Sequence, residues 1–145
     1  MIALDFFTQQ QAIFEYIREH FKEYLEALPE PDYVHDFPDP DKYKHEGTLF
    51  VQFGHYGFQR LTNESESMTI TLSVYLVVRN AVPETLKERL LKYTTAFYQM
   101  FDASAQNLGG IVDYGTIESI IIYEYVEGRR DTKASEITLL LTVEL

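Results

Sequence analysis

Met68-Thr-Ile-Thr-Leu-Ser-Val-Tyr-Leu-Val-Val78 is the stretch that decides the fold class of this 145-residue chain. Every second residue from Met68 to Val78 is apolar, and most of the residues between them carry a hydroxyl group. A period of two is typical of a strand that buries one face and leaves the other mainly polar. We therefore predict one long β-strand over residues 68–78.

Amphipathic helices are expected before and after this strand. The first should cover residues 8–28, with Thr8 as its N-cap in capping-box spacing with Gln11. Its apolar residues recur at spacings of three and four, and Pro29 should end it. The second should open at Pro83, because proline is tolerated in a first helical turn.

Further strands are expected on both sides of the second helix. Residues 48–53 read as a short strand, and residues 56–61 as either another strand or an irregular edge. Two strands should end the chain, over about 111–126 and 136–145, joined by a polar hairpin loop at 127–135.

These elements predict a single α+β domain over residues 1–145. It should have one mainly antiparallel or mixed sheet of four to five strands, with both helices packed on one face. The segment 29–47 holds four of the five prolines and four aspartates, so we expect a loop without an inner strand there. That loop is either a surface excursion or a partner contact.

Composition narrows the possible functions. The net charge is −11, and a surface this acidic repels a phosphate backbone, so groove-type DNA binding is not expected. Cysteine is absent, which excludes a disulfide framework and a cysteine-ligated metal. No signal peptide or membrane-spanning apolar run is recognisable, so we expect a soluble, cytoplasmic protein without a membrane partner.

No catalytic pattern is found, and we predict neither an enzyme nor a cofactor or metal site. The pairs His35-Asp36 and His45-Glu46 flank Asp39 and Asp41, but no pair has the spacing of helical metal ligands. Solvated loop residues are the favoured interpretation. Nucleophile elbows, phosphate-binding glycine loops and dinucleotide fingerprints are all missing from the sequence.

Six apolar residues should lie on the face of the sheet that the helices leave open. Strand parity assigns Ile121, Leu139 and Leu141 to the core. The six residues have the opposite parity and should therefore point away from the helices. They are Tyr75, Val77, Ile120, Ile122, Val126 and Leu140. Apolar patches of this kind mark partner surfaces, so we predict that these residues form a subunit interface. The alternative is that the loop at 29–47 folds over them.

The basic doublet of this acidic chain lies in the predicted hairpin loop. Gly128, Arg129 and Arg130 are either a solvated turn or a contact with an acidic neighbour or with passing nucleic acid. We take them as a candidate partner-contact loop.

Three features together resemble one known family. They are the N-terminal amphipathic helix; Gly47-Thr-Leu-Phe-Val-Gln-Phe, followed by a hairpin and a long strand that ends Tyr75-Leu-Val-Val-Arg-Asn80 before the second helix; and the terminal pair Ile117-Glu-Ser-Ile-Ile-Ile-Tyr and Glu136-Ile-Thr-Leu-Leu-Leu-Thr-Val. Over nearly its whole length the chain resembles the tail terminator, or tail completion, proteins of long-tailed bacteriophages.

The resemblance implies a structural virion protein of a phage or prophage tail, assembled in the host cytoplasm. It implies a homo-oligomeric ring, typically a hexamer, that caps the tail tube, stops its polymerisation and docks the head–tail connector or neck protein. DNA would pass through the lumen without specific binding. A different class stays open: a small non-enzymatic α+β binding or regulatory module, including another head–tail joining protein, that acts as a monomer or dimer.

Overall fold

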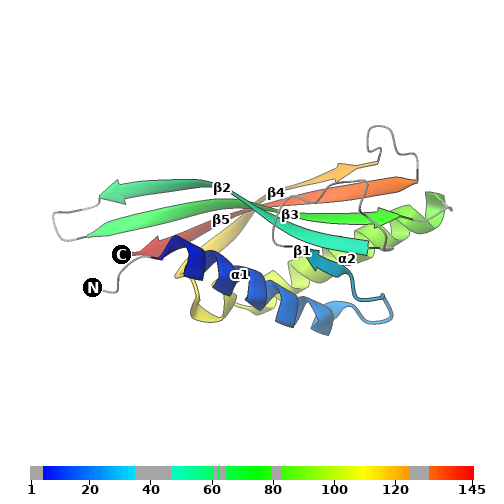
Figure 1. Cartoon of the computed structure of the whole chain (residues 1–145), viewed down its shortest axis with the longest axis horizontal. Helices are drawn as coiled ribbons and strands as arrows, with labels where there is room; N and C mark the ends of the chain where they lie inside the picture. Colours follow the sequence, from blue (N-terminus) through cyan, green and yellow to red (C-terminus); the bar gives the residue numbers. More distant parts are fainter. Residues whose placement is uncertain (1–4, 35–46, 61, 63–64, 80–82, 125–130) are drawn as a thin grey trace.

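One five-stranded sheet and two α-helices make up the fold (Figure 1). The computed structural model describes residues 5–34, 47–60, 62, 65–79, 83–124 and 131–145. The strands are β1 (Asp32–Val34), β2 (Gly47–Arg60), β3 (Glu66–Arg79), β4 (Tyr114–Tyr123) and β5 (Thr132–Glu144). The helices are α1 (Phe6–Phe21) and α2 (Pro83–Ala103), with short 3-10 turns η1 (Lys22–Tyr24) and η3 (Leu108–Gly110).

The strands lie in the order β1-β2-β3-β5-β4. β1 pairs in parallel with β2, and every other neighbouring pair is antiparallel. Both helices lie on the same side of this mixed sheet (Figure 1), with α2 packed on β3 and β5 and α1 packed beside α2. The predicted α+β class, with one mixed sheet and two helices, is confirmed.

β3 is the strand predicted from its period of two. It is paired along nearly its full length with β2 on one side and β5 on the other. Its helix-facing side chains are at most 1% exposed, and they are Met68, Ile70, Leu72, Val74, Leu76 and Val78. Burying an aliphatic side chain of this size contributes roughly 1.5–3 kcal/mol, so this row is the centre of the core.

α1 begins earlier and ends earlier than predicted. Its N-cap is Asp5, whose Oδ1 accepts a hydrogen bond from the Thr8 backbone N–H at 3.1 Å. The Thr8 hydroxyl donates to the same carboxylate at 3.0 Å instead of capping the helix itself. These bonds, the backbone one first, lower the pKa of Asp5. The α-helix stops at Phe21, and η1 follows before Pro29 is reached.

The segment 29–47 contains a strand that was not predicted. β1 forms three parallel pairs, between residues 32–34 and residues 48–50 of β2. A short edge strand tolerates this composition because it needs one hydrogen-bonded neighbour only, and Pro31 precedes the paired residues. Residues 35–46 lie outside the described residues. The open question about residues 56–61 is answered for 56–60, which continue β2.

Gly115 offers a test of the packing. A Cβ atom there would lie 2.6 Å from Leu141 Cδ2 and 3.0 Å from the Gln106 carbonyl oxygen. We expect Gly115→Ala to lower the free energy of unfolding by about 1–3 kcal/mol, because a packed core resists added atoms. Gly54→Ala is the matched control, since its nearest contact would be 3.6 Å away. Urea denaturation of both variants measures the difference, and equal midpoints would contradict the packing described here.

Candidate functional site

β4, at the edge of the sheet, carries most of the exposed large apolar side chains of the described strands. β4 is the last strand in the order, so it pairs with β5 on one side and with no described strand on the other. Four large apolar side chains on it are exposed, namely Tyr114 (55%), Ile120 (40%), Ile121 (44%) and Tyr123 (38%). We call these side chains, together with the outer backbone edge of β4, the β4 edge surface.

A β-bulge shapes the β4 edge surface. The pairing of β4 with β5 shifts between Ile117 and Ser119, so Glu118 is an extra residue in β4. An extra residue reverses which of the following side chains face the helices, because neighbours in a strand point to opposite sides. The reversal decides which residues this strand presents on each side.

This bulge overturns the predicted face of the β4 residues. Ile120 and Ile122 point to the helix side, with Ile120 directly opposite Ile137, and Ile122 packs against the main core. Ile121, predicted as a core residue, lies opposite Glu136 on the open side and is 44% exposed. The period-two assignment failed because it counted through Glu118 as if the strand were regular.

The other open-face predictions divide between half-buried and buried positions. Tyr75, Val77 and Leu140 lie on the open side, as strand parity predicted. Val77, however, is 6% exposed and belongs to a small open-side cluster with Phe50, against which Val34 of β1 packs. Val77 is therefore covered within the monomer, which supports the alternative that part of segment 29–47 folds over this face, and its interface role stays a prediction.

The remaining predicted core and contact residues lie in three kinds of position. Leu139 and Leu141 are fully buried core residues, as predicted. Tyr75 and Leu140 are half-buried, and their interface role stays a prediction. Four further predicted contact residues lie outside the described residues, namely Val126, Gly128, Arg129 and Arg130.

One carboxylate, that of Glu136, lies among aromatic residues on the open face. Glu136 Oε1 accepts a hydrogen bond from the Tyr123 hydroxyl at 2.8 Å, and Oε2 accepts one from Ser73 Oγ at 3.2 Å. The bond to Glu136 is the main cause that raises the pKa of Tyr123. Burial, followed by the charge of Glu136, raises the pKa of Tyr75. Both phenols therefore stay protonated, and able to donate, at neutral pH.

β2 offers a second sheet edge on the opposite side of the molecule. β1 covers residues 48–50 of β2, and no described strand pairs with the outer side of residues 51–60. Phe58 on this stretch is 52% exposed. Because β2, β3, β5 and β4 alternate in direction, β2 and β4 are antiparallel to each other (Figure 1).

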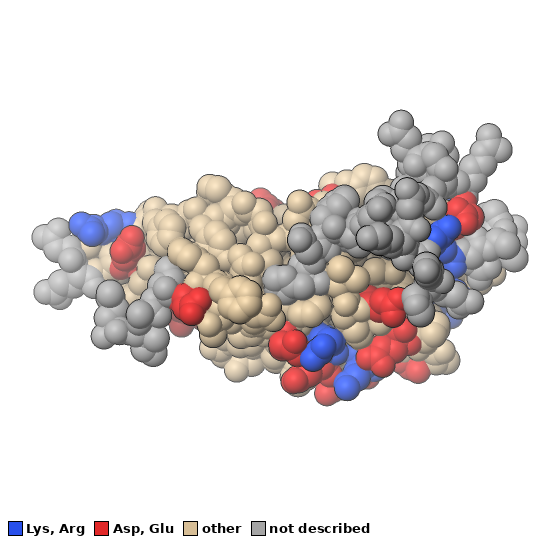
Figure 2. Space-filling view, viewed as in Figure 1, with Lys and Arg blue, Asp and Glu red and all other residues tan. Residues whose placement is uncertain are grey.

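Charged side chains gather on the helical side of the molecule, whereas much of the middle of the view in Figure 2 is uncharged.

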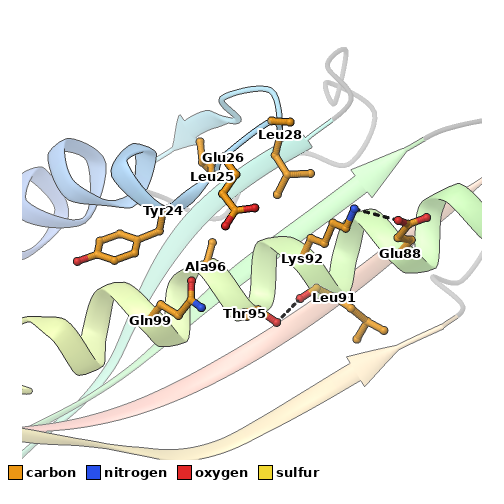
Figure 3. Close-up of a pocket in the computed structure, with 11 residues that line it drawn as sticks. Tyr24, Leu25, Glu26, Leu28, Glu88, Leu91, Lys92, Thr95, Ala96 and Gln99 are labelled. Carbon is orange, nitrogen blue, oxygen red and sulfur yellow. Dashed lines mark hydrogen bonds and ion pairs between the residues drawn. The ribbon is translucent and has the colours of Figure 1, made fainter.

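A hollow of about 460 Å³ lies between α2 and the turn that follows η1 (Figure 3). Its lining includes Glu88 and Lys92, which form an ion pair at 2.9 Å, and Thr95, which donates to the Leu91 carbonyl at 2.8 Å. These interactions join residues of α2 to one another.

The described residues offer no metal centre, since no group of three or more His, Cys, Asp or Glu among them could hold an ion. In the same part of the chain, no helix is both long and apolar enough to cross a membrane.

Comparison with known proteins supports the fold at the level of structure alone. No family model matches the chain, and no curated protein matches it. A solved structure described as "Virion of native gene transfer agent (GTA) particle" contains a similar chain, with a TM-score of 0.55 and 13% sequence identity. The similarity covers 94% of this chain and 94% of that chain, so the two share their fold over almost their whole length.

The face assignment of β4 and β5 can be tested with charged substitutions. Ile121→Glu should leave the monomer folded, because that side chain is 44% exposed on the open side. Leu139→Glu should unfold it, because the fully buried site would hold an unpaired charge. Circular dichroism melts compare the two variants. Equal loss of the folded state in both would show that Ile121 belongs to the core.

Proposed function

We propose that this chain is a structural virion protein that assembles head to tail into a closed ring, typically of six copies. As a tail terminator, the ring would cap the tail tube, stop its polymerisation and dock the head–tail connector or neck protein. DNA would pass through the opening without specific binding. The fold shared with a chain of a gene transfer agent virion supports a virion role. That the chain is not an enzyme stays part of this proposal.

The observation that carries the ring proposal is the pair of sheet edges on opposite sides of one sheet. An unpaired edge presents backbone N–H and C=O groups in the pattern that another strand needs. Because β4 and β2 are antiparallel, β4 of one copy can extend the sheet of the next copy by pairing with residues 51–60 of its β2. A contact between two different surfaces repeats from copy to copy, and it closes into a ring when the rotation allows.

Strand parity restricts the register of such a contact. Side chains on the open face of one copy must meet open-face positions of the next copy, because directly opposed residues share a face. Ser119 of β4 and His55 of β2 both lie on the open face, opposite Thr138 and Thr71 respectively. Pairing Ser119 with His55 of the next copy therefore preserves both faces, and so does a shift of two residues, to Gly57.

The absence of cysteine from this sequence makes disulfide trapping a clean test of the contact. Ser119→Cys combined with His55→Cys, or with Gly57→Cys, should give a ladder of covalent oligomers on non-reducing gels. Within one copy these positions are three strand spacings apart, roughly 14 Å, which is too far for a disulfide. The cross-link must therefore join two copies.

The control for the trapping experiment is Ser119→Cys with Phe58→Cys, which lies opposite Met68 on the helix side of β2. This pair has mismatched faces and should stay uncross-linked. The ring proposal is wrong if neither open-face pair cross-links and native mass spectrometry finds single copies of 16.9 kDa.

An edge charge should prevent assembly without unfolding the chain. Ile121→Lys places an ammonium group on the β4 edge surface, and lysine on a sheet edge opposes pairing with another strand. We expect native mass spectrometry and negative-stain images to show rings for the unmodified chain and monomers for Ile121→Lys. Thr95→Lys, at an exposed position on α2, is the matched control and should leave the rings intact.

The second candidate is a non-enzymatic binding module that acts as a dimer. The β4 edge surface favours it as well, because two copies related by a two-fold axis can pair β4 with β4 in antiparallel fashion. A native mass of two copies, with disulfide trapping between β4 positions and none between β4 and β2, would favour this dimer over the ring.

A further inference from the structure

We propose that the open face carries a binding site for an arginine side chain of a partner protein, built from Tyr75, Tyr123 and Glu136, with the buried Phe50 ring stacked on Tyr75. The site shares Tyr123 with the β4 edge surface, but it binds through side chains, whereas the ring proposal rests on the backbone edges of β4 and β2. Its test therefore needs only the folded chain, and its failure would leave the ring proposal untouched.

The four strands bring the parts of this site into one row. Phe50 lies directly opposite Tyr75, Tyr75 opposite Glu136, and Glu136 opposite Ile121. The Phe50 and Tyr75 rings are stacked, with centroids 4.7 Å apart and planes 9° from parallel. Phe50 is 2% exposed, so its ring supports Tyr75 from within the protein and does not meet a ligand itself. The row thus sets the Glu136 carboxylate beside the half-buried Tyr75 ring, and Tyr123 borders it on the outer strand.

Glu136 retains capacity for a cation. Its oxygens accept hydroxyl groups from Tyr123 and Ser73, and a third hydrogen bond, with the Tyr75 hydroxyl, contributes to the raised pKa of that phenol. An ionised carboxylate can accept about four hydrogen bonds, so capacity for one more donor is left. Among the described residues, no Lys or Arg forms an ion pair with Glu136. The bond between Tyr123 and Glu136 is exposed, so an incoming group can approach this carboxylate from solvent.

The surroundings of Glu136 favour a guanidinium group over other ligands. Arginine is planar, donates two parallel hydrogen bonds to a carboxylate and stacks on aromatic faces. A lysine ammonium satisfies the charge but does not stack in this way. A hard metal ion needs more oxygen ligands than one carboxylate supplies, and an anion would be repelled.

A partner that docks on the open face would have to supply a cation for the Glu136 carboxylate. Covering Glu136 with an uncharged surface would remove a half-buried carboxylate from water without a compensating charge, which is costly. A partner that supplies an arginine offsets this cost and fixes its own position on the sheet. The net charge of −11 adds a long-range attraction for a basic partner surface.

The test uses N-acetyl-arginine amide and N-acetyl-lysine amide as probes, titrated into the full chain with ¹³C-labelled tyrosine rings. We expect the arginine probe to shift the NMR signals of Tyr75 and Tyr123, and to bind several-fold more tightly than the lysine probe. Glu136→Gln should weaken arginine binding roughly tenfold or more, because it replaces a charge-assisted bond by a neutral one.

Glu144→Gln is the matched control, because Glu144 lies on the same strand and the same face and is exposed. It should leave the arginine affinity unchanged. Tyr75→Leu should remove the preference for arginine over lysine while both probes still bind. Equal binding of the two probes, equal loss in Glu136→Gln and Glu144→Gln, or no shift of Tyr75 and Tyr123 in the unmodified chain would each overturn the proposal.

Discussion

Burial of the helix-facing side of β3 is the constraint on which the rest of the structure depends. β3 is the central strand, and its alternating apolar row from Met68 to Val78 is almost completely removed from water. A one-residue slip of either neighbour would turn that neighbour's buried side chains to the open face, so the core fixes the registers of β2 and β5. β4 then takes its register from β5, and the two sheet edges follow.

A core built on one side of a sheet leaves two kinds of surface for other proteins. The helices satisfy the apolar face only, so backbone groups at the outer edges of β2 and β4 and the side chains of the open face are left for other contacts. Edge contacts are set mainly by backbone geometry and need little side-chain specificity. Open-face contacts are set by side chains such as Glu136 and Tyr75, which can select one partner chemistry.

The sequence predicts the parts of this fold that depend on long local patterns, and it misses the parts that depend on pairing between distant strands. The period-two run of β3 and Pro83 at the start of α2 are local signals, and both elements occur as predicted. β1 has three residues among prolines and aspartates and exists through its pairing with β2, so no local pattern could indicate it. Asp5 and Thr8 are both capping residues, and only the folded helix shows which one caps.

The bulge at Glu118 explains why the face of the later β4 residues was predicted wrongly, and it also determines which β4 side chains reach the open face. Without the extra residue, Tyr123 would point toward the helices and could not donate to Glu136 from the open side. The same reversal turns Ile121 to the open side, where it is 44% exposed. Bulges re-aim side chains and are frequent at sheet edges. The irregularity that strand parity could not foresee therefore decides which side chains β4 contributes to both proposed contact surfaces.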